Sequence, residues 1–254
     1  MGAGAVDSLR ATKTYHRATA VPPCVAERPA PPAARPPGTV TVVNRLRRIV
    51  SAIGVGYLIG TFPTADLVAR RAAGGVDLRS AGSGNPGSAN ALQVLGARAG
   101  ATVLAGDIGK GALACVAGAF VAGPVGAHAA GTASVIGHCY PVWNGFRGGK
   151  GVATSVGQCL ATFPAYFPID VAVAVVTAAN PRWKQRAFAA TGASSACWVV
   201  GGLVWWVRGR RNLWGPRPNA MLPLASAASS AVIIHRFLAA RPPDPPAGQE
   251  PATI

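Results

Sequence analysis

Charged residues are scarce in this 254-residue chain, and acidic ones are the scarcest. Only 13% of the residues are Asp, Glu, Lys or Arg, whereas 50% are hydrophobic and the mean hydropathy is +0.31. This balance is too apolar for an ordinary soluble domain. Charge is wholly absent from the stretches 111–146, 151–169, 187–207 and 218–235. Runs of about 18 residues or more can cross the hydrocarbon of a bilayer as helices, so a membrane protein is the leading class.

Two other patterns are absent. Apolar and polar residues do not alternate along the long runs, which excludes the strands of a membrane β-barrel, so helices must satisfy the backbone inside the lipid. The five cysteines form no C-x-x-C pair, which favours small buried side chains over disulfides or metal ligands. The sequence therefore predicts an all-α polytopic membrane protein without a metal site.

The hydrophobic pattern predicts one membrane domain, 49–240, between two disordered tails. Residues 1–48 are basic and proline-rich, have no sustained apolar period and lack the apolar core of a secretory signal, and 241–254 have a similar composition. Gly123 and Pro124 predict a turn that splits the longest uncharged run. The expected spans are 49–69, 99–121, 125–143, 151–163, 165–180, 187–207 and 219–238. The fourth and fifth are the weakest, so the expected number of helices is about seven, with a range of five to seven.

The formal net charge of +16 is compatible with nucleic acid, anionic lipid or a small anionic ligand as a partner. Most basic residues lie in the first tail or between apolar spans, which disfavours a nucleic-acid module. The positive-inside rule places the basic loops 70–98, 144–150 and 181–186 in the cytoplasm. The same seven-span arrangement puts the basic tail and the segment 208–218 on the opposite face, in conflict with that rule.

Residues 81–90, AGSGNPGSAN, contain the spacing G-x-G-x-x-G, and Asp107 follows twenty positions after Gly87. A dinucleotide-binding fold needs a buried strand before these glycines and a soluble β-α-β unit around them. The preceding residues, GGVDLRSA, are polar, and Asp107 falls inside an expected span. The dinucleotide interpretation is therefore disfavoured.

The same glycines could instead present backbone N–H groups to an oxyanion in a concave turn. A plain turn is the alternative. The short polar and basic side chains available to such an anion are Arg79, Ser83, Asn85, Ser88 and Asn90.

A second glycine-rich stretch, GFRGGKG at 145–151, stands at the start of an expected span. Lys150 lies there beside free helical N–H groups and the positive end of the helix dipole, which together attract phosphate. Arg147 adds a second positive charge. The stretch is not a Walker A loop, because Asn144 occupies the position of the first glycine and Gly151 that of the Ser or Thr.

Polar groups also lie within the expected spans. Asp107 and Lys110 are three residues apart on one helix and share a face, as a structural ion pair or as the wall of an active site. His138 could be a base, a hydrogen-bond anchor or a structural residue. His235, with Arg236, closes the last span and could reach either lipid headgroups or the same polar face.

Four motifs, in their order and spacing, resemble the integral-membrane acyl-phosphate:glycerol-3-phosphate acyltransferases, the PlsY family. They are GYLIGTFPTADLVAR, DLRSAGSGNPGSAN, LGARAGATVLAGDIGKG and GHCYPVWNGFRGGKGVATSVG. The resemblance implies a seven-helix enzyme of the bacterial cytoplasmic membrane, with glycine-rich loops and an active site at the cytoplasmic face. It implies transfer of a fatty acyl group from acyl phosphate to the sn-1 hydroxyl of glycerol 3-phosphate, which gives lysophosphatidic acid for phospholipid biosynthesis, without a cofactor or metal.

The resemblance also implies roles for single residues. Ser83 matches the essential serine of the family, Arg79 and Asn85 match its neighbours, and His235 matches the histidine of a third motif; these four are the expected catalytic group. The expected phosphate-binding residues are Gly84, Gly87, Asn90, Gly148, Gly149, Lys150 and Gly151. The expected supporting residues are Asp107, Lys110, His138 and Arg147. The general base is open between a substrate phosphate oxygen, Ser83 and His235.

The chain also departs from the family pattern. Ala89 and Gln93 stand where the family has Thr and Arg, and Phe237-Leu238 stand where it has Glu-Asn. The glycine-rich loops are therefore intact, whereas the third motif is eroded. Two alternatives follow: a non-catalytic paralogue that binds a phosphorylated lipid or metabolite, and a transporter of phosphorylated metabolites, for which we find no inverted repeat.

Overall fold

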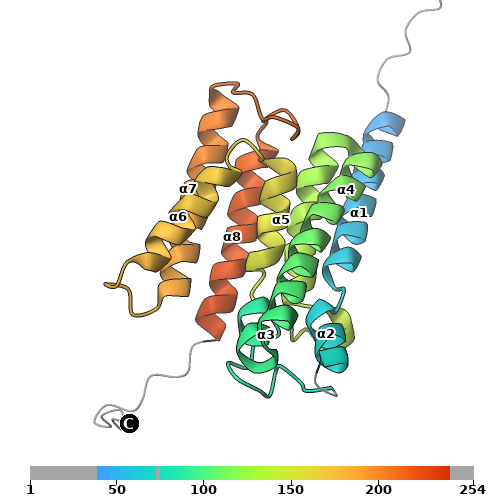
Figure 1. The fold of residues 1–254 in the computed structure, drawn as a ribbon. Helices are drawn as coiled ribbons and strands as arrows, with labels where there is room; N and C mark the ends of the chain where they lie inside the picture. The colour runs from blue at the N-terminus through green and yellow to red at the C-terminus, as the bar shows by residue number, and fades with distance from the viewer. Residues whose placement is uncertain (1–38, 73–74, 241–254) are drawn as a thin grey trace, which may run out of the picture. The chain divides into compact units, whose positions relative to one another are not determined.

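The computed structural model describes residues 39–72 and 75–240, all of which belong to one compact unit. Every regular element in these residues is helical. In chain order the elements are α1 (Thr39–Gly60), α2 (Thr64–Ala72), α3 (Ser88–Leu95), α4 (Ala97–Cys139), the short 3-10 helix η1 (Val142–Asn144), α5 (Val152–Thr162), α6 (Phe167–Ala179), α7 (Arg186–Val207) and α8 (Met221–Ala239). The long helices lie side by side, and α2 and α3 lie at one end of them (Figure 1).

The helix α4 is a hairpin. Ala122 and Gly123 leave the helical conformation, and Gly123 has a φ of 64°, which glycine adopts without a steric penalty. Pro124 then opens the second half, as proline commonly does in the first turn of a helix. The two halves fold back against each other so closely that a Cβ atom on Gly118 or Gly126 would overlap the carbonyl of the other. The predicted turn at Gly123 and Pro124 is confirmed.

Together with α1 and α5–α8, the two halves of α4 give seven segments that run between two ends of the bundle (Figure 1). We call the end with α2, α3, the loop 140–151 and the end of α8 the site end. The other, with the start of α1, the turn at 122–123 and the loop 208–220, is the far end. The three basic loops expected on one face thus share the site end (Figure 1), and the all-α fold with about seven helical segments is confirmed.

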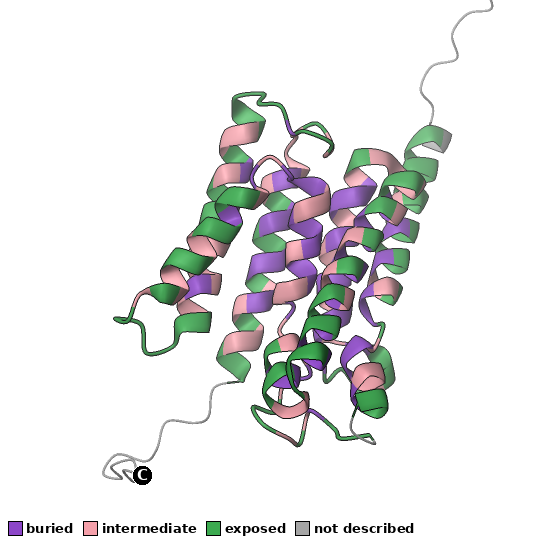
Figure 2. Cartoon of the chain, in the orientation of Figure 1, coloured by how far each residue is buried: buried purple, intermediate pink, exposed green. Residues whose placement is uncertain are grey.

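The described helices have the composition of membrane spans. Four helical stretches are long and apolar enough to cross a bilayer: Thr41–Ala72, Ala97–Asn144, Arg186–Val207 and Met221–Ala239; α6 is apolar but shorter. Buried residues concentrate between the helices, whereas the outward faces of α1, α6 and α7 are largely exposed (Figure 2). These outward faces carry large apolar side chains such as Val50, Val176 and Val207, which lipid would cover.

The first span is the one whose boundaries were predicted wrongly. We expected 49–69, but α1 begins at Thr39 and ends at Gly60, so residues 39–48 of the expected tail are helical. The chain leaves the helix because Pro63 lacks an N–H group and disfavours the helical conformation at Phe62, and it resumes as α2. The other residues of the expected tails, 1–38 and 241–254, lie outside the described residues.

Close backbone contact joins α1 to the second half of α4. A Cβ atom on Gly56 would overlap the backbone of Ala130, and one on Gly60 would overlap the backbone of Ser134. Two small residues four positions apart are the usual way for membrane helices to approach, because van der Waals packing replaces the hydrophobic effect between them. The contact fixes α1 against α4 along the length of the helices.

We expect Gly56→Ala to destabilise the bundle by about 1–3 kcal/mol, because the added methyl group has no space against Ala130. Gly54→Ala is the matched control, since nothing lies within 4 Å of a Cβ atom at Gly54. The measurement is thermal unfolding of the two variants and the parent in the same detergent. Equal melting temperatures for the two variants would contradict the proposed contact.

Candidate functional site

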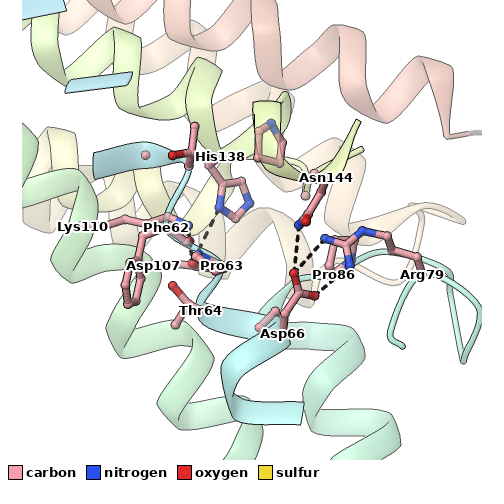
Figure 3. A pocket seen from close by; sticks show the side chains of 16 residues that line it. Phe62, Pro63, Thr64, Asp66, Arg79, Pro86, Asp107, Lys110, His138 and Asn144 are labelled. Carbon is pink, nitrogen blue, oxygen red and sulfur yellow. Dashed lines mark hydrogen bonds and ion pairs between the residues drawn. The ribbon is translucent and has the colours of Figure 1, made fainter. Parts of the chain in front are cut away.

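A small polar cavity of about 30 Å³ lies at the site end (Figure 3). It is formed where the break between α1 and α2, the loop before α3, the first half of α4 and the loop 140–151 meet. The polar and charged residues that line it are Thr61, Thr64, Asp66, Arg79, Asp107, Lys110, His138 and Asn144, together with the backbone of Gly148 and Gly149. A cavity of this size holds a few water molecules at most.

Three buried ionisable groups form one side of the cavity. Lys110 Nζ lies 2.8 Å from Asp107 Oδ1, and His138 Nδ1 lies 3.6 Å from the same oxygen. Lys110 Nζ also donates a hydrogen bond of 3.2 Å to the carbonyl of Phe62, at the break before Pro63, and the N–H of Thr64 donates to the same carbonyl at 2.9 Å. All three side chains are at most 8% exposed. Charges inside a membrane helix are normally paired and face the bundle interior, and these do both.

On the other side, Asp66 and Arg79 form a bidentate ion pair. The guanidinium nitrogens of Arg79 donate to the two carboxylate oxygens of Asp66 at 2.7 and 3.2 Å. Arg79 Nε donates to the backbone carbonyl of Arg147 at 2.9 Å, and Asn144 Nδ2 donates to Asp66 at 2.9 Å. The hydrogen bond that Arg79 donates to Asp66 outweighs partial burial and raises the pKa of Arg79, so Arg79 remains charged. This network ties the first glycine-rich loop to the second.

Asn90 organises the first glycine-rich loop. Its Nδ2 donates to the carbonyls of Leu78 and Ala81, each at 2.9 Å, and its Oδ1 accepts from the N–H of Ser83 at 2.8 Å. Gly82 packs on the Asn90 carboxamide and has a φ of 59°, so this position requires glycine. With all its polar atoms engaged, Asn90 shapes the turn that carries Ser83.

Ser83 itself is exposed, and its hydroxyl has no hydrogen-bond partner among the described residues. Gly84, also at positive φ, follows it. Neither residue lines the cavity, and the same holds for Asn85 and Gly87. The loop therefore displays Ser83 at the surface of the site end.

The second glycine-rich loop folds onto the end of α4. The N–H groups of Gly148 and Gly149 donate to the carbonyls of Cys139 and His138 at 3.1 and 3.2 Å. A Cβ atom at Gly149 would overlap the imidazole of His138, so the loop can approach only with glycine here. These two N–H groups are therefore used within the protein. The first turn of α5, which begins directly after Gly151, still has free N–H groups for an anion.

The end of α8 closes over this loop. Arg236 donates from Nε to the carbonyl of Gly149 at 3.1 Å and from Nη2 to that of Gly148 at 2.7 Å. Lys150 Nζ lies 4.3 Å from the centre of the Phe237 ring, a cation–π contact. Burial, and secondarily the charge of Arg236, lowers the pKa of Lys150. His235 Nδ1 shares a hydrogen bond of 2.8 Å with the Tyr140 hydroxyl.

The structure thus brings some expected site residues into the cavity and leaves others around it. Those that line it are Arg79, Asp107, Lys110, His138, Gly148 and Gly149, whereas Ser83, Asn85, Arg147, Lys150, Gly151 and His235 lie outside its lining. Asp66, Thr64 and Asn144 were not predicted. A carboxylate within an expected apolar span was the available signal for Asp66, since such residues are rarely placed there without a function or partner.

The helices and the two glycine-rich loops define a polytopic membrane protein with both loops and a polar cavity at one end. The sequence model of the family described as "Glycerol-3-phosphate acyltransferase" matches residues 50–239. The chain belongs to this glycerol-3-phosphate acyltransferase family and is an integral membrane protein.

Curated relatives bear the same description. Glycerol-3-phosphate acyltransferases of Exiguobacterium sibiricum and Clostridioides difficile are 46% and 47% identical over 119 and 135 residues, 47% and 51% of this chain. These alignments span 57% and 66% of the relatives' own lengths. The relative from Rubrobacter xylanophilus is 39% identical over 177 residues, 65% of this chain and 86% of its own.

Two solved structures share the fold. Both are of PlsY (YgiH), described as an integral membrane glycerol 3-phosphate acyltransferase. The glycerol 3-phosphate form has a TM-score of 0.60 at 29% identity, with 77% of this chain and 88% of that chain covered. The lysophosphatidic acid form has a TM-score of 0.58 at 28% identity, with 74% and 87% covered.

We expect Asp66→Asn to loosen the first glycine-rich loop, because it removes the charge that holds Arg79. Hydrogen exchange of residues 75–87 should rise several-fold, as for the loss of a charge-assisted hydrogen bond of about 1 kcal/mol or more. Asp77→Asn is the control, since the half-exposed Asp77 side chain lies 3.3 Å from the Arg79 guanidinium, and an Asn oxygen can still accept the 2.9 Å hydrogen bond from the Arg79 N–H. Equal exchange in both variants would show that the Asp66 pair does not hold the loop.

Proposed function

We propose that this chain transfers a fatty acyl group from acyl phosphate to the sn-1 hydroxyl of glycerol 3-phosphate and forms lysophosphatidic acid. The observation that carries the proposal is the joining of two glycine-rich loops at one end of a membrane bundle. Arg79, bound to Asp66 and to the carbonyl of Arg147, makes that junction. Family membership, and solved relatives described as glycerol 3-phosphate and lysophosphatidic acid forms, support the same reaction.

The cavity is too small for glycerol 3-phosphate, so we place the phosphate groups at its mouth, against the loops. Lys150 and the first turn of α5 supply positive charge and N–H donors there. Ser83 presents a hydroxyl without a partner among the described residues. The acyl chain of the donor remains in the bilayer beside the helices. The basic loops of the site end assign this face to the cytoplasm by the positive-inside rule.

For this reaction the protein mainly has to orient the two substrates and stabilise the charge that develops during acyl transfer. An acyl phosphate is an activated mixed anhydride: the sn-1 oxygen bonds to the acyl carbon, the bond to the phosphate oxygen breaks, and inorganic phosphate leaves. The hydroxyl proton passes to a base during this step. Fixed positive charge and N–H groups stabilise the charge that develops on the carbonyl and on the leaving phosphate. This reaction proceeds without a cofactor or metal.

One observation favours a second candidate, a paralogue that binds a phosphorylated lipid or metabolite without turnover. Lys150 packs on Phe237, at the position where the resemblance leads us to expect a carboxylate. Binding without product formation would distinguish this candidate from the enzyme.

We expect membranes that contain the protein to convert glycerol 3-phosphate and acyl phosphate to lysophosphatidic acid, and acyl-CoA not to replace acyl phosphate. Ser83→Ala and Lys150→Ala should each lower the rate at least about 100-fold, the usual loss when one charge-stabilising donor is removed. Lys184→Ala, which removes an exposed basic side chain at the same end, is the matched control. Full activity in the first two variants would refute the site; glycerol 3-phosphate binding with no product would favour the paralogue.

The lowered pKa of Lys150 predicts a pH dependence of substrate binding. Lys150 is charged below its pKa and loses its proton at a lower pH than a free lysine, whose pKa is about 10.4. The KM for glycerol 3-phosphate should therefore rise with pH, and the rise should begin at a lower pH than the titration of a free lysine would give. Lys150→Arg stays charged throughout and should remove this rise. A KM that rises equally in the parent and the Lys150→Arg variant would assign the titration to another group.

A further inference from the structure

A second and larger hollow, of about 630 Å³, lies at the far end. Ala112, Ala119 and Phe120 of the first half of α4 line it, with Leu160 of α5 and Trp214 and Pro216 of the loop 208–220. Nearly all of the lining is apolar or small. Its volume is in the range of small-molecule sites.

The hollow is separated from the candidate active site by a closed helix seam. A Cβ atom on Gly111 would overlap the Thr154 carbonyl, and one on Gly157 would overlap the Ile108 carbonyl, so α4 and α5 touch backbone to backbone there. The residues of α4 and α5 that line the hollow, Ala112 to Pro124 and Leu160 to Ala161, follow this seam toward the far end. The hollow therefore forms a separate apolar groove on membrane-spanning helices.

The loop that completes the groove is held by hydrogen bonds. Buried Asn212 donates from Nδ2 to the carbonyls of Thr162 and Pro216 at 2.9 and 2.7 Å. Trp214 Nε1 donates to the carbonyl of Leu160 at 3.3 Å, and Trp205 Nε1 donates to that of Arg211 at 3.2 Å. The rim of the groove is thus a defined structure beside α5.

The same loop carries an unbalanced positive charge. The exposed arginines on either side of Trp214 are Arg208, Arg210, Arg211 and Arg217. None of them has an acidic group within 4 Å among the described residues, and the sequence has no Asp or Glu between Asp170 and Asp244. Arg48 of α1 lies at this end too, where its Nε donates to the carbonyl of Val121 beside the turn of α4. These arginines are the ones that conflict with the positive-inside rule.

We propose that the far end binds an anionic phospholipid, with its phosphate on the arginines of the loop 208–217 and an acyl chain in the groove. An apolar groove on membrane helices fits a hydrocarbon chain, and guanidinium groups bind phosphate in a bidentate manner. Trp214 at the rim is the residue type that lies at the level of lipid headgroups. Binding of this lipid gives the far-end arginines the anionic partner that the described residues do not supply.

The headgroup contact is tested on the full-length protein in detergent, with phosphatidylglycerol or phosphatidylcholine of identical chains added. Native mass spectrometry should show retention of phosphatidylglycerol at least about tenfold above phosphatidylcholine. Replacement of Arg208, Arg210, Arg211 and Arg217 by Gln should abolish this preference. The matched control replaces four site-end arginines, Arg70, Arg71, Arg98 and Arg182, by Gln and should keep it. Equal retention of both lipids by the parent, or an unchanged preference in the far-end variant, would overturn the proposal.

The groove is tested by Ala119→Trp, which fills it and leaves the arginines in place. Retention of phosphatidylglycerol should fall at least about tenfold, whereas Ala105→Trp, on an exposed position of the same half of α4, should have no effect. The KM for acyl phosphate should not change in either variant. Unchanged lipid retention in Ala119→Trp, or a raised KM for acyl phosphate with normal lipid retention, would show that the groove does not hold the phospholipid chain.

Discussion

The candidate site depends on how the second glycine-rich loop seats on the end of α4. The N–H groups of Gly148 and Gly149 donate hydrogen bonds to the last carbonyls of that helix. Arg236 of α8 donates to the carbonyls of the same two glycines. Every backbone group in this contact thus has a partner, as the interior of a membrane protein requires. The contact leaves no space for a side chain at residue 149, so this position requires glycine.

The buried charged side chains lie beside this loop and are paired. Asp107 and Lys110 would be costly as isolated ions within the bundle, but they pair with each other, and Lys110 also donates to the carbonyl of Phe62. His138 Nδ1 lies 3.6 Å from the same carboxylate oxygen. Asp66 and Arg79 repeat the arrangement nearer the surface and connect the two loops. The two groups of paired charges therefore line one polar cavity at the site end.

Hydrophobic runs and helix breakers predicted most of the fold, because a bilayer allows few alternatives to a helix. The spans from α4 to α8 lie close to their expected bounds, and the turn at Gly123 was visible in the sequence. The start of α1 was not, since residues 39–48 carry three arginines and have no apolar run to mark them. In the site, glycine spacing located both loops, but it did not show that Asn90 uses all its polar atoms within the turn. Nor could it place Asp66, whose partner Arg79 is thirteen residues away.

The shortness of α5 has a consequence for the surrounding lipid. Its eleven residues extend about 16 Å, roughly half the thickness of the hydrocarbon layer. The link to α6 is not exposed to lipid at this depth: Phe163 and Tyr166 are buried against α7 and α8. No residue of α5 is exposed, so neighbouring helices, rather than lipid, surround this half-length segment. The bundle can therefore contain a helix too short to span the bilayer without deforming the membrane around it.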